Sequence, residues 1–218
     1  MENLVPHEEA PQQEGGTARL EAFSDGVFAI AVTLLVLDLK VPSGLSPITP
    51  LTLAAALVSK WPNYLTLVIS FATILIMWVY HHNLFKAAKK SEPLLLFSNG
   101  LLLLLVTMVP FPTALVGAYL TTPAASVACA TYAGFFVLID SAYNLLWWVV
   151  SRQQSRDRLR GRRFSMSMLI SLLGFPCYLI ATVVAFWSPL LTLFICGALW
   201  IVWAMTVPRP RTEQRNRL

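Results

Sequence analysis

The sequence predicts an all-α integral membrane protein whose subunit has six transmembrane helices and two cytoplasmic termini. Of the 218 residues, 56% are hydrophobic and 12% are charged, and the mean hydropathy is +0.65. A soluble domain is about 45–50% apolar and about 25% charged, so a soluble chain of this size could not bury so much apolar surface. The apolar residues fall into six continuous runs, each close to the ~20 residues that a helix needs to cross ~30 Å of hydrocarbon. Disordered and disulfide-scaffold proteins are excluded by the same composition.

The six apolar runs predict helices rather than a β-barrel, because they are continuously apolar and do not alternate. Only helices then satisfy the backbone hydrogen-bonding groups in lipid. Pro110 and Pro112 lie inside the third run and predict that the helix kinks or that its regular part ends early. Ser188-Pro189 predicts a tight turn between the last two helices. The transmembrane helices are expected at about residues 23–39, 61–80, 93–120, 124–150, 166–187 and 190–207.

One membrane domain is expected at residues 19–207, because no soluble domain fits before, between or after the apolar runs. Residues 1–18 contain four glutamates with two glycines and two prolines, and they predict a disordered acidic tail. A secretory signal is not expected, since its basic first region is missing. Residues 208–218 predict a basic cytoplasmic tail.

The basic residues predict the orientation in the cell membrane. With the N-terminus inside, all of the 16 Lys and Arg residues except Lys40 and Lys60 fall on the cytoplasmic side. Cytoplasmic loops carry an excess of Lys and Arg, so both termini are predicted in the cytoplasm. The basic cluster at residues 152–163 could bind nucleic acid or anionic lipid. Contact with lipid headgroups is the favoured interpretation, and no nucleic-acid partner is expected.

The first apolar run carries an aspartate near its cytoplasmic end. Ionisable groups inside a membrane segment are costly and usually face a partner or water. We expect Asp25 to pair with Arg19, or with His81 or His82 at the end of the second run. The alternative is a capping role, in which Ser24 or Asp25 accepts hydrogen bonds from the first turn of the helix.

The same run carries an apolar stripe. Ile30, Leu34 and Leu37 are spaced at i, i+4 and i+7, so they lie within about 60° of one another on one helix face. Phe23 and Val27 extend this face toward the cytoplasm. Such a stripe taken alone is typical of ordinary helix packing.

The run from Arg19 to Asp38, RLEAFSDGVFAIAVTLLVLD, contains the pattern Arg-x-x-x-Phe-Ser-Asp, and a histidine pair ends the second run. This segment resembles the first-helix signature of the transmembrane protein 175 family, which includes the endolysosomal potassium channel and its prokaryotic relatives. The resemblance implies a homotetramer of six-helix subunits around a central pore that the first helix lines. It implies passive conduction by a potassium-permeable cation channel, with no enzymatic activity and no cofactor other than the permeant K⁺.

The resemblance also assigns the pore-lining positions. It places the main constriction at Ile30, with Leu34 and Leu37 on the next turns, and it links Thr33 to cation preference. A ring of four isoleucines would repel water, so that an ion sheds part of its hydration shell there. K⁺ holds water less tightly than Na⁺, which predicts modest selectivity for K⁺ and a hydrophobic gate. Asp38 either attracts cations to the extracellular mouth or is a solvated helix end.

The resemblance further implies a polar network that ties the first helix to the second and third. Its members are expected to be Arg19, Phe23, Ser24, Asp25, His81 and Asn99.

Two other classes of function compete with a channel. A secondary transporter or small-molecule exporter would need a binding site at mid-membrane between repeats, and no repeat is evident. A membrane enzyme would need a catalytic motif. The histidine pair has no carboxylate at helical spacing beside it, no metal site is expected, and hydrolase and phosphate-loop motifs are absent from the sequence. The tryptophan and tyrosine side chains, among them Tyr143, Trp147 and Trp203, predict interfacial belts and packing.

Overall fold

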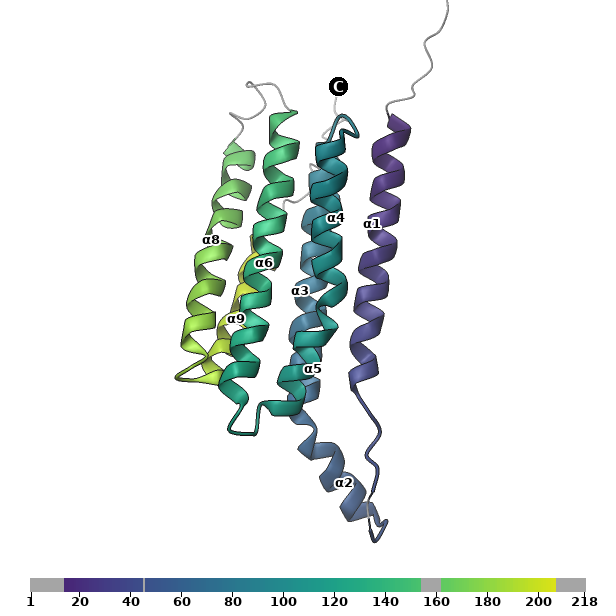
Figure 1. The fold of residues 1–218 in the computed structure, drawn as a ribbon, viewed down its shortest axis with the longest axis vertical. Helices are drawn as coiled ribbons and strands as arrows, with labels where there is room; N and C mark the ends of the chain where they lie inside the picture. The colour runs from purple at the N-terminus through teal and green to yellow at the C-terminus, as the bar shows by residue number, and fades with distance from the viewer. Residues whose placement is uncertain (1–13, 45, 154–161, 207–218) are drawn as a thin grey trace, which may run out of the picture.

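The computed structural model describes residues 14–44, 46–153 and 162–206, with side chains described for 16–44, 46–153 and 173–206. Every regular element within these ranges is helical (Figure 1). The elements are α1 (Glu14–Leu34), the 3₁₀ helix η1 (Leu35–Asp38), α2 (Pro50–Ser59), α3 (Trp61–Phe85), α4 (Pro93–Met108), α5 (Pro110–Tyr119), α6 (Ala125–Arg152), α8 (Arg162–Val184) and α9 (Pro189–Thr206).

Five segments of the described chain are long and apolar enough to cross a membrane. They are Gly16–Asp38, Trp61–Phe85, Pro93–Tyr119, Ala125–Arg152 and Pro189–Thr206. These segments match five of the six expected spans. The remaining expected span, at residues 166–187, corresponds to α8, whose described apolar part is the shorter Leu173–Val184. Residues 166–172 of that span lie outside the residues with described side chains.

One helix boundary differs from that expected, and one helix was not expected at all. Helix α1 begins at Glu14, so residues 14–18 of the expected tail are helical, and residues 1–13 lie outside the described chain. Helix α2 was not expected, because prolines punctuate this part of the sequence. Thr49 and Thr52 form a capping box, and Pro50 occupies the first helical turn, where its missing N–H costs nothing. The basic tail at 208–218 also lies outside the described residues.

The regular part of the third run ends early, which is one of the two outcomes expected from its prolines. The helix is interrupted at Val109, immediately before Pro110, and continues as α5. The side-chain hydroxyl of Thr113 donates to the Val109 carbonyl oxygen at 2.8 Å. Ser70 of α3 contacts both the Thr113 hydroxyl at 2.7 Å and the Tyr132 hydroxyl of α6 at 2.9 Å. This buried polar cluster joins three helices at the interruption.

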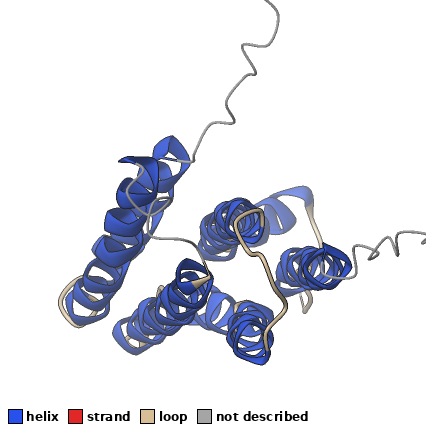
Figure 2. Cartoon of the chain, turned by 90° about the horizontal axis from the view of Figure 1, so that it is seen from above, coloured by secondary structure: helices blue, strands red, loops and turns tan. Residues whose placement is uncertain are grey.

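Helix α6 lies at the centre of the bundle and contacts α4, α5, α8 and α9. Its inward side chains, such as Tyr132, Phe136 and Leu146, are fully buried. Helix α1 lies at one edge and packs against α3 and α4, as the two views of the bundle show (Figures 1 and 2). Helix α1 therefore keeps one long face that stays exposed among the described residues.

Side-chain contacts place several helix ends together. Glu21 near the start of α1 contacts His82 near the end of α3, and Tyr80 of α3 contacts Thr206 at the end of α9. At the end of α6, the Gln153 side chain accepts from the backbone N–H groups of Lys89 and Lys90. The other described basic residues lie at this same end of the bundle. Lys40, which follows η1, and Lys60, which follows α2, lie at the opposite end.

Candidate functional site

Helix α1 has one buried face and one exposed face. Ser24, Phe28, Ala31 and Leu35 are each at most 2% exposed, and their spacing of four, three and four residues places them on one side. These side chains face α3 and α4. The buried face therefore fixes how α1 is rotated about its own axis.

The exposed face carries the stripe that the sequence singled out. Ile30, Leu34 and Leu37 are 58%, 37% and 67% exposed, and Phe23 is exposed further along the same helix. Ile30 and Leu34 are one turn apart, about 6 Å along the axis. Leu37 lies in η1, and residues three apart eclipse in a 3₁₀ helix, so Leu37 follows Leu34 along the axis. The change of helix type thus keeps the stripe on one side.

Thr33 and Asp38 supply the polar atoms near this face. The Thr33 hydroxyl is exposed and donates to the Ile30 carbonyl oxygen at 2.8 Å, so its oxygen lone pairs stay available. The carboxylate of Asp38 is oriented differently. Its Oδ2 atom is buried and has no hydrogen-bond partner among the residues that the structure describes.

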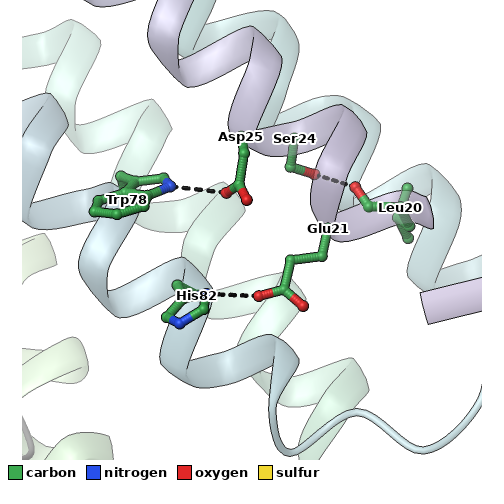
Figure 3. A network of polar contacts seen from close by, with 6 residues as sticks. All are labelled: Leu20, Glu21, Ser24, Asp25, Trp78 and His82. Atoms are coloured by element: carbon green, nitrogen blue, oxygen red, sulfur yellow. Dashed lines mark hydrogen bonds and ion pairs between the residues drawn. The ribbon is translucent and has the colours of Figure 1, made fainter. Parts of the chain in front are cut away.

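Two contacts, which we call the α1–α3 ladder, join matched positions on neighbouring helices (Figure 3). The Trp78 Nε1–H donates to Asp25 Oδ1 at 2.7 Å, and His82 Nδ1 contacts Glu21 Oε1 at 2.6 Å. Glu21 and Asp25 are four residues apart on α1, as are Trp78 and His82 on α3. The indole and imidazole rings stack with their centroids 6.0 Å apart. The ladder is partly exposed and lies at the end of the bundle where α1 begins.

A second set of contacts, the Ser24–Asn99–His81 chain, is fully buried and joins three helices. The Ser24 hydroxyl donates to the Leu20 carbonyl oxygen at 2.8 Å and accepts from Asn99 Nδ2 at 2.9 Å. Asn99 Oδ1 contacts His81 Nε2 at 2.8 Å, and because an amide oxygen only accepts, Nε2 carries a proton. His81 Nδ1 has no hydrogen-bond partner within the described part of the chain. The imidazole stacks on Phe85, with centroids 4.4 Å apart.

The structure brings Ser24, His81 and Asn99 together, and it places Asp25 beside them with a different partner from those expected. The partner of Asp25 is Trp78, where the sequence predicted Arg19 or one of the two histidines. Arg19 and Phe23 are exposed, and no contact described for this structure joins them to the ladder or to the buried chain. Glu21 and Trp78 were missed. The matched i, i+4 spacing of acidic residues on one helix and ring N–H groups on the next was the available signal.

Known proteins resemble this chain in sequence and in structure. The family model described as "Endosomal/lysosomal potassium channel TMEM175" matches residues 19–110, the part of the chain that holds the ladder and the buried chain. A protein of Chamaesiphon minutus named as a potassium channel is 43% identical over 202 residues, which cover 90% of this chain and 97% of that protein. The chain belongs to the TMEM175 family. The family is one of ion channels and not of enzymes.

Other TMEM175 proteins are similar over different shares of their length. A potassium channel of Streptomyces collinus is 39% identical over 90% of this chain and 96% of its own. The human protein named as an endosomal/lysosomal proton channel is 30% identical over 82% of this chain but only 37% of its own length. A crystal structure of a lysosomal potassium-selective channel TMEM175 homolog from Chamaesiphon minutus superimposes with a TM-score of 0.80 at 42% identity. The superimposed region covers 89% of this chain and 100% of the Chamaesiphon minutus chain.

Proposed function

We propose that this TMEM175 chain forms a potassium-permeable cation channel in the cell membrane. Four six-helix subunits with cytoplasmic termini surround a central pore that α1 lines. One observation carries the proposal: the apolar face of α1 is uncovered at the edge of the bundle, in a chain 43% identical to a protein named as a potassium channel. A second observation supports the pore-lining role of this face. The opposite face of α1 holds the polar contacts, so the helix is oriented from within the subunit.

The constriction follows from the side chains on this face. Four copies of Ile30 around an axis make a narrow ring without charged ligands, and Leu34 and Leu37 extend it by two further turns. An apolar ring repels water, and a small increase in its radius allows water to enter, so it acts as a gate as well as a filter. The ring favours K⁺ because K⁺ loses hydration water more readily than Na⁺. Selectivity is modest, since no ring of carbonyl groups replaces the hydration shell.

The polar residues have complementary roles in this channel. Thr33 presents a hydroxyl oxygen three residues after the constriction and influences which cation passes. The α1–α3 ladder and the Ser24–Asn99–His81 chain hold the rotation of α1, which decides whether Ile30 faces the axis. Phe23 extends the exposed face toward the cytoplasm, and Arg19 lies at the cytoplasmic boundary of α1. The permeant ion is K⁺, and no resident cofactor takes part.

The proposal is tested by recording from the purified protein in planar bilayers with mixed K⁺ and Na⁺. Ile30→Asn introduces an amide into the proposed ring, so we expect the reversal potential to shift toward greater Na⁺ permeability. Ile180→Asn on α8 is the matched control, because Ile180 is also an isoleucine with 58% of its surface exposed. We expect this control to leave the reversal potential unchanged.

Three results would contradict the proposal. The first is a reversal potential that Ile30→Asn leaves unchanged, and the second is an equal shift in Ile180→Asn. The third is transport that needs a coupling gradient and shows no unitary current steps, which would indicate a carrier.

A further inference from the structure

A second site lies within the subunit, on the other side of α3 from α1. A cavity of about 40 Å³ is lined by α3, α6, α8 and α9. Asp140 of α6 lines it, and most of the other lining residues are aromatic: Tyr80, Phe136, Tyr143, Trp147, Tyr178 and Trp203. None of these residues takes part in the pore proposed above.

Asp140 is the acidic group of this cavity. Its side chain is 4% exposed, and Oδ2 accepts a hydrogen bond from Asn144 Nδ2 at 2.8 Å. Gly174 of α8 faces the other carboxylate oxygen, where a Cβ atom would clash with Oδ1. Glycine at this position therefore leaves room for the carboxylate. A carboxylate this deep in a membrane segment is costly without a partner of opposite charge, and such residues commonly mark sites of function.

The aromatic wall is held together by ring contacts. Tyr178 stacks on Phe136 with centroids 5.5 Å apart and meets Trp203 edge-on at 6.2 Å. Trp203 also contacts the ring of Tyr80 at 6.2 Å, and the Tyr80 hydroxyl donates to the Trp203 carbonyl oxygen at 3.0 Å. These contacts fix aromatic rings around a carboxylate.

The lining decides between water, a metal cation and an organic cation. A buried water needs two to four polar partners, and the lining supplies few polar atoms: the Asp140 carboxylate, the hydroxyls of Tyr143 and Tyr178, and the hydroxyls of Tyr80 and Thr73, which already donate to backbone carbonyls. The wall is otherwise apolar, so it suits a ligand that is itself mostly apolar better than it suits water. A dehydrated K⁺ needs a shell of oxygen atoms, which the same wall does not supply. An alkylammonium ion suits both the carboxylate and the aromatic rings of the lining. Its N–H donates to the carboxylate, and its methyl groups contact the ring faces.

The volume sets the size of this ion. One water-sized group needs about 10–15 Å³ of such space, so the cavity holds about three to four groups of this size, and trimethylammonium, with four non-hydrogen atoms, is at the upper limit. We propose that the cavity binds a small alkylammonium cation, of the size of methylammonium to trimethylammonium, at Asp140. The bound cation contacts α3, the helix that also carries Trp78 and His82 of the ladder.

The proposal is tested by titrating trimethylammonium chloride into the purified full-length protein and measuring the thermal midpoint and tryptophan fluorescence. Sodium chloride at equal concentration controls for ionic strength, and tert-butanol is the neutral compound of similar bulk. We expect a saturable rise in midpoint with trimethylammonium alone. We expect Asp140→Asn to abolish this response, and Glu92→Gln, which removes an exposed carboxylate before α4, to retain it.

A second variant covers the case in which Asp140→Asn does not fold, as judged by gel filtration and circular dichroism. Trp203→Phe keeps the carboxylate of Asp140 but replaces an indole with a phenyl ring, which is the weaker cation–π partner. We expect this variant to bind trimethylammonium about tenfold more weakly. The proposal is overturned by any of three results: no saturable response in the unmodified chain, an equal response to tert-butanol, or unchanged affinity in whichever of the two variants folds. None of these outcomes depends on whether the protein conducts ions.

Discussion

At the scale of residues, the hydrogen bond between Trp78 and Asp25 is the contact that most directly restrains α1 against α3. The indole N–H donates to a carboxylate at 2.7 Å, and hydrogen bonds to charged groups are stronger than those between neutral groups. Partial exposure reduces this contribution, because water competes for both partners. The adjacent contact between Glu21 and His82 holds the same two helices one turn away.

Replacing Trp78 with phenylalanine removes this donor and keeps an aromatic ring. We expect Trp78→Phe to destabilise the folded protein by about 1–2 kcal/mol, because the carboxylate of Asp25 loses its partner. The measurement is the thermal midpoint of the purified protein in detergent. Trp187→Phe is the control, since Trp187 is 79% exposed at the turn between α8 and α9. Equal midpoints for the two variants would show that the hydrogen bond between Trp78 and Asp25 does not restrain α1.

The sequence predicted some of these contacts and missed others for a physical reason. Ser24, His81 and Asn99 belong to one network, as the motif indicated. The motif did not identify Trp78, because a tryptophan at the end of an apolar run is typical of a membrane interface. Whether an indole faces lipid or a carboxylate depends on the rotation of two helices, which their separate sequences do not specify.

At the scale of elements, the crossing of α3 and α5 depends on a glycine. A Cβ atom at Gly117 would clash with the side-chain amide nitrogen of Asn63 and would contact its Cγ tightly, so a larger residue here requires the Asn63 side chain to move. By contrast, a Cβ atom at Gly100 of α4 would have no described atom within 4 Å. The two glycines therefore differ in what surrounds them, although both lie within apolar helices.

Alanine substitutions separate these two surroundings. We expect Gly117→Ala to destabilise the protein by about 1–3 kcal/mol, since the added methyl group displaces the Asn63 side chain from its place between α3 and α5. We expect Gly100→Ala to be neutral or to stabilise the helix by up to about 1 kcal/mol. Thermal unfolding of both variants in one detergent measures the difference. A loss of stability in Gly100→Ala as large as that in Gly117→Ala would contradict the close approach of α3 and α5.

Periodicity and proline positions predicted the long helices and the interruption at Pro110, but not α2. Prolines at positions 42, 47 and 50 punctuate this part of the sequence, yet Pro50 begins a helix because Thr49 caps it. The 3₁₀ segment at the end of α1 was also missed, since the sequence there continues the apolar pattern. Local capping and changes of helix type depend on single side-chain contacts, which apolar periodicity does not report.

At the scale of the whole molecule, the described basic residues other than Lys40 and Lys60 gather at the end of the bundle where α1 begins. The orientation proposed for this end is cytoplasmic. Ser91 follows α3 at that end, and Ser43 precedes α2 at the other, and both side chains are exposed. These two serines therefore report on opposite sides of the membrane.

Cysteine labelling in intact cells tests this orientation. We expect a membrane-impermeant maleimide to label Ser43→Cys from outside, and Ser91→Cys only after the membrane is permeabilised. The unmodified chain is the control, because Cys129 and Cys196 are buried and Cys177 is partly buried. Labelling of Ser91→Cys in intact cells would place the basic end outside and would reverse the proposed orientation.

The proposed channel also requires the exposed face of α1 to meet copies of itself. One chain leaves Ile30 and Leu37 more than half exposed, an arrangement that suits either a pore or contact with lipid. A density map of the purified assembly in a lipid nanodisc separates these two cases. We predict four subunits around one axis, with the four Ile30 side chains forming its narrowest point. A map in which Ile30 faces lipid or a neighbouring helix, away from any axial passage, would contradict the proposed channel.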